Sequence, residues 1–171
     1  MKTFQGYRSK IISCVGAATC QLAIVLFLFT PLHMAIAETK ETVVEYNQGG
    51  QKLIGYEYTD TEITEQSPGV LVFPDWMGIT DFAKDRAKKL VDLGYRAFVV
   101  DIYGDGKLAK DANEAGQLAT KFKSDRPLLR LRAAAALQAF LKDKLVDPES
   151  LGAIGFCFGG TAALELARTG A

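Results

Sequence analysis

The stretch Gly155-Phe156-Cys157-Phe158-Gly159-Gly160 decides the fold of this 171-residue chain. It lies between a short apolar run, Leu151 to Ile154, which predicts a buried strand, and a segment of helical periodicity, Thr161 to Arg168. A strand followed at once by a helix leaves room for one sharp turn, with Cys157 at its tip. We therefore predict that Cys157 is a nucleophile, lifted clear of a sheet by a strained backbone conformation.

The glycines around Cys157 support this interpretation. Gly155 and Gly159 lie two places before and after the cysteine and lack a Cβ, so strand and helix can approach closely. Gly160 adds room where the helix packs down. A cysteine at a helix N-terminus is also favoured as a thiolate. The alternative is a buried cysteine in an ordinary glycine-rich turn. A phosphate-binding loop is not indicated, because no Gly-Lys-Ser/Thr follows.

The first 37 residues have the pattern of a secretory signal peptide. Lys2, Arg8 and Lys10 give a basic start, residues 11–32 are largely apolar, and Ala35-Ile36-Ala37 is a small-x-small cleavage site. We predict cleavage near Ala37 and export to the periplasm or the medium. An uncleaved membrane anchor is the alternative, since the apolar stretch is long enough to span a bilayer.

Charge and cysteine content limit the possible functions. The chain has 20 basic and 20 acidic residues, and removal of residues 1–37 leaves a slightly acidic domain, which gives no indication of nucleic-acid binding. Cys14 and Cys20 leave with the signal peptide, so a disulfide framework is excluded and Cys157 is a lone, reactive thiol. No histidine, cysteine and carboxylate cluster has metal-ligand spacing, so neither a metal nor another cofactor is expected.

Residues 38–171 alternate between strand and helix patterns and are predicted to form a doubly wound α/β domain with a mostly parallel sheet. An N-terminal β-hairpin is expected first. The expected elements are strands Thr42 to Tyr46, Lys52 to Tyr58, Gly69 to Phe73 and Arg96 to Val100, and helices from Thr80 to Leu93, Leu108 to Phe122 and Pro127 to Leu145.

Ligands of such a sheet bind beyond the carboxyl ends of its strands. Pro74 to Gly78, Asp101 to Gly106 and the turn at Cys157 are expected to meet there. Asp101 and Tyr103 are interpreted mainly as structural braces. A further set of basic residues is interpreted as a solvated helix face rather than a site for a substrate carboxylate: Arg126, Arg130 and Arg132.

Three motifs together resemble the dienelactone hydrolase family of α/β-hydrolases: Phe73-Pro-Asp-Trp-Met-Gly78, Gly94-Tyr-Arg-Ala-Phe-Val-Val-Asp-Ile-Tyr-Gly104 and Gly155 to Gly160. The resemblance implies that Cys157 is the nucleophile and that a catalytic aspartate and histidine follow the elbow helix. The sequence ends at Ala171 and its one histidine is His33, so we expect a domain truncated after that helix and inactive in turnover.

The resemblance also implies roles for the loop after Phe73. Asp75 matches a carboxylate, commonly glutamate in the family, that helps to set the protonation of the cysteine; bracing the loop is the alternative role. The backbone N–H groups of Trp76 and Phe158 match the two oxyanion donors. The implied reaction is hydrolysis of a small-molecule ester or lactone. A truncated or inactive relative and a thiol redox module remain alternatives, and the oligomeric state stays open.

Overall fold

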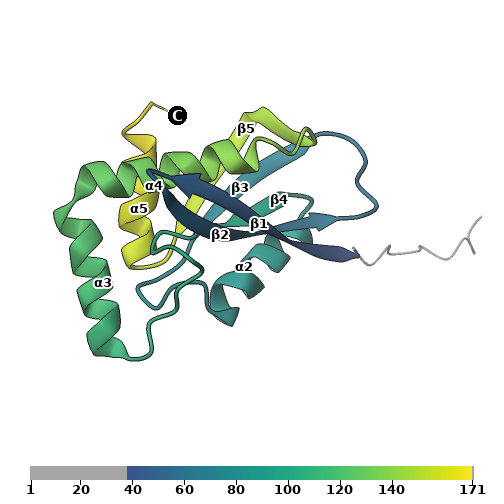
Figure 1. Cartoon of the computed structure of the whole chain (residues 1–171). Helices are drawn as coiled ribbons and strands as arrows, with labels where there is room; N and C mark the ends of the chain where they lie inside the picture. The colour runs from purple at the N-terminus through teal and green to yellow at the C-terminus, as the bar shows by residue number, and fades with distance from the viewer. Residues whose placement is uncertain (1–37, 171) are drawn as a thin grey trace, which may run out of the picture. The chain divides into compact units, whose positions relative to one another are not determined.

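A five-stranded sheet with helices on both faces organises residues 38–170, the part of the chain that the computed structural model describes (Figure 1). The predicted signal peptide lies outside the described residues. The elements are β1 (Thr39–Gln48), β2 (Gln51–Asp60), β3 (Ser67–Phe73), α2 (Asp81–Val91), β4 (Arg96–Val99), α3 (Ala112–Ser124), α4 (Arg126–Phe140), β5 (Val146–Gly155) and α5 (Phe158–Ala167). Among these residues no helix is long and apolar enough to cross a bilayer.

The sheet has the strand order β1-β2-β4-β3-β5. β1 and β2 form the predicted antiparallel hairpin, and β2 joins the rest of the sheet by antiparallel pairing with β4. β4 and β5 lie on either side of β3, and each pairs with it in parallel. Because parallel strands end at one edge, the loops after Phe73, Val99 and Gly155 all begin there. The predicted α/β-hydrolase-type architecture is confirmed.

The core has two parts, one on each face of the sheet, and alternate side chains of β3 pack into one or the other. Leu71 and Phe73 belong to a cluster on one face, covered by α3, α4 and α5, which contribute Phe122, Phe140 and Phe158 among others. Val72 belongs to a second cluster on the opposite face, which α2 covers. A strand buried on both faces is typical of a parallel sheet and explains the continuous apolar run of β3.

Polar contacts move two helix boundaries from their predicted places. α3 begins after Asp111, whose carboxylate accepts the Glu114 N–H at 2.9 Å, so Leu108 precedes the helix in an exposed loop. α4 ends at Phe140 and not near Leu145. Its end is fixed by Asp143, which bonds through its N–H to the Phe140 carbonyl and through its carboxylate to buried Arg96.

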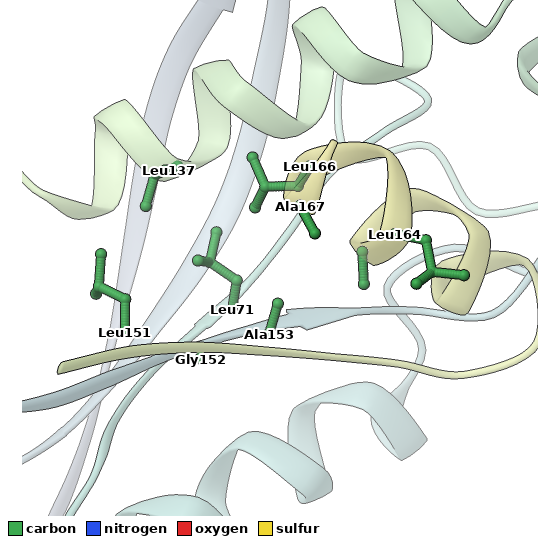
Figure 2. Close-up of a pocket in the computed structure, with 9 residues that line it drawn as sticks. Leu71, Leu137, Leu151, Gly152, Ala153, Leu164, Leu166 and Ala167 are labelled. Carbon is green, nitrogen blue, oxygen red and sulfur yellow. The ribbon is translucent and has the colours of Figure 1, made fainter. Parts of the chain in front are cut away.

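Thr80 is the N-cap residue of α2, although its side chain makes no capping hydrogen bond. One further prediction about local structure was wrong. Leu151 to Ile154, predicted as buried, are exposed on β5, because β5 is the edge strand of the described sheet and pairs only with β3. Figure 2 shows the apolar hollow beside this strand. It is lined by Leu71, Leu137, Leu151, Gly152, Ala153, Ala163, Leu164, Leu166 and Ala167.

Two carboxylates, those of Glu57 and Asp143, lie close together near Arg96, the first residue of β4. Burial first, then the charge of Asp143 and a hydrogen bond with it, raises the pKa of Glu57 to about 7. Arg96 lies close enough to oppose this shift, and its guanidinium is 2.5 Å from the Asp143 carboxylate. The folded protein therefore holds a proton on Glu57 more tightly than an unfolded chain does.

This pair predicts a pH-dependent effect of Glu57→Gln on stability. A group whose pKa is raised by folding lowers the free energy of unfolding as the pH rises from its ordinary value of 4.5 through about 7. Glu57→Gln removes that loss, so the variant should gain stability relative to wild type between pH 4.5 and 7 and keep the gain above pH 7. Urea unfolding at several pH values measures it, with the exposed Glu62→Gln as control. A pH-independent difference would contradict the prediction.

Candidate active site

Cys157 lies at the tip of the turn between β5 and α5, with φ 52° and ψ −110°. Positive φ is sterically unfavourable for a residue with a Cβ; among the described non-glycine residues only Cys157 and Asp105 have it. The thiol is free and exposed. The predicted strained turn is thus present, and it holds the sulfur outside the sheet at the start of a helix. The role of the thiol as a nucleophile stays a prediction.

The strain is maintained by close backbone packing at the two flanking glycines. A Cβ on Gly159 would lie 2.2 Å from the Phe73 carbonyl oxygen and 2.3 Å from that of Pro74. A Cβ on Gly155 would lie 2.3 Å from the backbone of Gly159. Gly160 is different, since a Cβ there would lie 3.5 Å from its nearest neighbour, the Gly155 carbonyl oxygen, which is an ordinary contact distance. Helix, turn and strand end are therefore fixed against one another at Gly155 and Gly159, and less so at Gly160.

The loop after β3 lies against this turn. The Phe156 N–H donates to the Phe73 carbonyl at 3.1 Å, which ties the start of the turn to the end of β3. Within the loop, the Asp75 carboxylate accepts the Met77 N–H at 2.8 Å. Trp76 is 39% exposed between them. The observed hydrogen bond of Asp75 is that of a loop brace, and its predicted influence on Cys157 stays a prediction.

Two glycines shape the surroundings of Trp76. Gly78 ends the loop with φ 95°, and a Cβ there would lie 2.6 Å from the Lys107 carbonyl, so only glycine fits. Gly116 on α3 faces the indole ring, which would be 3.9 Å from a Cβ at that position. The indole is therefore flanked by α3.

Tyr103 braces the loop after β3, in agreement with its interpretation as a structural brace, but the sequence did not reveal which groups it contacts. Its hydroxyl donates to the Trp76 carbonyl at 2.8 Å. Its ring stacks on that of Phe158, with centroids 5.7 Å apart and planes at 23°. Burial, and then the charges of Asp75 and Cys157, raise the pKa of Tyr103 above its ordinary value. The structure thus brings Tyr103, Asp75 and Cys157 together; the one signal in the sequence was a tyrosine at a strand end on the ligand-binding edge.

A family model now identifies the fold more closely. The model described as "Dienelactone hydrolase family" matches residues 53–171. The chain belongs to the dienelactone hydrolase family. A curated relative from a Bradyrhizobium species, named "Probable 2-oxo-3-(5-oxofuran-2-ylidene)propanoate lactonase", is 33% identical over 127 residues, which cover 74% of this chain and 50% of that protein.

Solved structures of the same family superpose on the described fold. One named m3DLH is 41% identical, with a TM-score of 0.75 over 78% of this chain and 55% of that chain. A dienelactone hydrolase-like promiscuous phosphotriesterase from metagenomic libraries is also 41% identical, with a TM-score of 0.76 over 80% of this chain and 56% of that chain. The chain therefore spans about half the length of these dienelactone hydrolase relatives.

Asp101 holds the loop after β4, as its interpretation as a brace predicts. Its buried carboxylate accepts N–H bonds from Gly104 at 2.9 Å and Gly106 at 2.8 Å. It also accepts the Ile54 N–H at 3.0 Å, which ties the loop to β2. This fixes the strand end from which Tyr103 extends toward Trp76.

The three arginines considered for a substrate carboxylate lie elsewhere. Arg126 and Arg130, half exposed, bind the buried carboxylate of Glu165 together with Arg168. The hydrogen bond from Arg130 lowers the pKa of Glu165. Arg132 was expected on a solvated face, but it is buried, and its Nε donates to Gln48 at 3.0 Å. None of these contacts includes the residues around Cys157.

Within residues 38–170, no group of three histidine, cysteine or carboxylate side chains is placed to hold a metal ion. The charges of Asp75 and Cys157 both act on the Tyr103 hydroxyl, which is itself bonded to the Trp76 carbonyl. Backbone N–H groups at the start of α5 lie next to Cys157 in the chain, and such groups can stabilise negative charge on the oxygen of a bound carbonyl.

The glycine packing gives a matched pair of variants. Gly159→Ala forces a methyl group into two carbonyl oxygens and should lower the free energy of unfolding by about 1–3 kcal/mol, or more if the turn cannot move. Gly160→Ala adds the same methyl group at ordinary contact distance inside a helix, and should be neutral or gain up to about 1 kcal/mol. Thermal unfolding measures both. Equal effects of the two substitutions would refute the assigned packing.

Proposed function

We propose that this protein hydrolyses ester or lactone bonds of small molecules through the thiolate of Cys157. The observation that carries the proposal is the strained backbone of Cys157 at an exposed strand-to-helix turn. That conformation presents a nucleophile, and the helix N-terminus behind it favours a thiolate. Membership of the dienelactone hydrolase family and the lactonase name of one relative support the same reaction class.

The first half-reaction forms a thioester. The Cys157 sulfur attacks the carbonyl carbon of the substrate, a C–S bond forms, and the π electrons move to the oxygen. The N–H groups of Trp76 and Phe158 are the proposed donors to that oxyanion. As the first residue of α5, Phe158 has an N–H with no intrahelical acceptor, so it is available to a ligand. Collapse of the intermediate expels the alkoxide, which takes a proton from water.

The second half-reaction needs a base that the described residues do not supply. Water must attack the thioester and release the acid and the thiol, and a general base normally accelerates that step. The residues 38–170 contain no histidine. The resemblance to the family implies that an aspartate and a histidine after the elbow helix assist this step. The described chain is therefore proposed to acylate readily and to deacylate slowly.

Asp75 is proposed to act on the thiol as well as on its loop. Besides burial, its charge and that of Cys157 both raise the pKa of Tyr103, so each of the two groups lies within electrostatic reach of the Tyr103 hydroxyl. A carboxylate near a thiol disfavours a second negative charge, so Asp75 is proposed to oppose in part the helix N-terminus, which favours the thiolate. The hydrogen bond to the Met77 N–H keeps the carboxylate in the loop.

The place of action is proposed from the N-terminal sequence alone. Residues 1–37 have the basic, apolar and small-x-small regions of a signal peptide, with cleavage near Ala37. The substrate would then be met in the periplasm or outside the cell.

Mixing the 171-residue chain with p-nitrophenyl acetate should release a single burst of p-nitrophenol, stoichiometric with Cys157. Acylation needs only the thiolate and the oxyanion donors, whereas the next turnover waits for deacylation. The burst amplitude in a stopped-flow trace and the mass of the acetylated peptide measure it. Cys157→Ala should abolish the burst.

Two results would contradict the proposal. A burst that persists in Cys157→Ala would show that the thiol is not the nucleophile. A wild-type thiol that peroxide oxidises but no ester acylates would favour the thiol redox module instead.

Asp75→Asn should shift the pH midpoint of the burst rate to lower pH, because removing the carboxylate charge makes the thiolate easier to form. The asparagine oxygen can still accept the Met77 N–H, so the unfolding temperature should change little. The exposed Asp92→Asn is the control for a general charge effect. An unchanged midpoint with a lower unfolding temperature would leave Asp75 as a loop brace only.

A further inference from the structure

Tyr103 makes two contacts that join the residues of the proposed oxyanion donors, Trp76 and Phe158. The phenol oxygen lies 2.8 Å from the Trp76 carbonyl oxygen, and the phenol ring stacks on the Phe158 ring. Behind it, the ring of Phe122 packs at 5.7 Å. Tyr103 therefore bridges the loop after β3 and the start of α5, two segments that otherwise meet through backbone contacts.

The hydrogen bond from Tyr103 completes the fixation of one peptide unit. The unit that joins Trp76 to Met77 has its carbonyl held by the Tyr103 hydroxyl and its N–H held by the Asp75 carboxylate at 2.8 Å. A peptide unit is planar, so two bonds at opposite edges fix its orientation. The direction of the preceding Trp76 N–H depends on that orientation through two backbone dihedral angles.

We propose that Tyr103 is a positioning residue that aligns the Trp76 and Phe158 N–H groups as a pair toward the oxygen of the acylation intermediate. This inference rests on the proposed function of Cys157. Tyr103 touches neither the sulfur nor the substrate carbonyl in this role. It acts through the Trp76 carbonyl and through the Phe158 ring, and so sets the geometry in which the two donors meet one oxygen.

The chemical state of Tyr103 suits a permanent donor. Burial and the neighbouring charges of Asp75 and Cys157 raise the pKa of its hydroxyl, so the phenol keeps its proton at neutral and alkaline pH. The Trp76 carbonyl can therefore accept a hydrogen bond from the phenol throughout that range of pH. The hydroxyl is thus suited to hold the loop and unsuited to act as a base.

Comparing two reactions of the same thiol tests the role of Tyr103. Acylation by p-nitrophenyl acetate passes through an oxyanion, whereas alkylation by iodoacetamide at sulfur does not. Tyr103→Phe keeps the stacked ring and removes only the hydroxyl. We expect the acylation rate constant to fall by about tenfold, part of the effect of losing one oxyanion donor, while the alkylation rate constant changes less than about twofold. Tyr95→Phe, which removes a phenol oxygen outside the described contacts of the site, should change neither rate.

Each outcome decides between the two hypotheses. Wild-type protein that alkylates at Cys157 but never acylates would overturn the proposed function, and the positioning role with it. Wild-type acylation that Tyr103→Phe leaves unchanged relative to alkylation would overturn the positioning role alone. Equal loss of both rates, or a variant that unfolds and alkylates like a denatured thiol, would make Tyr103 a structural residue and also overturn the proposal.

Discussion

The structure around the site depends on one steric constraint, the approach of the α5 N-terminus to the end of β3. At Gly159 there is no room for a Cβ, since the Phe73 and Pro74 carbonyl oxygens occupy that space. This contact places the first turn of α5 directly over the strand end, and Cys157 must then reverse the chain within one residue. Its positive φ follows from that requirement. A strained cysteine is thus held by packing that extends well beyond its own contacts.

The same edge of the sheet collects the groups to which the proposed acylation assigns a role. β3, β4 and β5 run parallel, so the loops that contain Asp75, Tyr103 and Cys157 begin side by side. Each loop is fixed by buried or paired polar groups, which is the condition for electrostatic stabilisation without reorganisation. Asp101 holds the Tyr103 loop to β2, and Tyr103 holds the Trp76 loop. These two contacts connect the hairpin, through the loop after β4, to the loop after β3.

The sequence predicted the features that depend on local patterns. The hairpin, the parallel strands and the turn at Cys157 follow from alternation, apolar runs and glycine spacing. The errors arise where distant contacts decide. α4 ends early because Asp143 binds Arg96, and Arg132 is buried because it reaches Gln48 on β1. Two further features also depend on residues far apart in the sequence, so the sequence pattern did not predict them. One is the edge position of β5, which exposes Leu151, and the other is the hydrogen bond from Tyr103 to the Trp76 carbonyl in another loop.

The central claim, that Cys157 is an exposed and activated thiol, is tested most directly by its alkylation rate as a function of pH. Iodoacetamide should label Cys157 in the native protein faster than it labels a free peptide thiol near neutral pH, because the helix N-terminus favours the thiolate. Mass spectrometry of the labelled peptide identifies the site. A Cys157 that labels only after denaturation would contradict the account and leave the fold without its nucleophile.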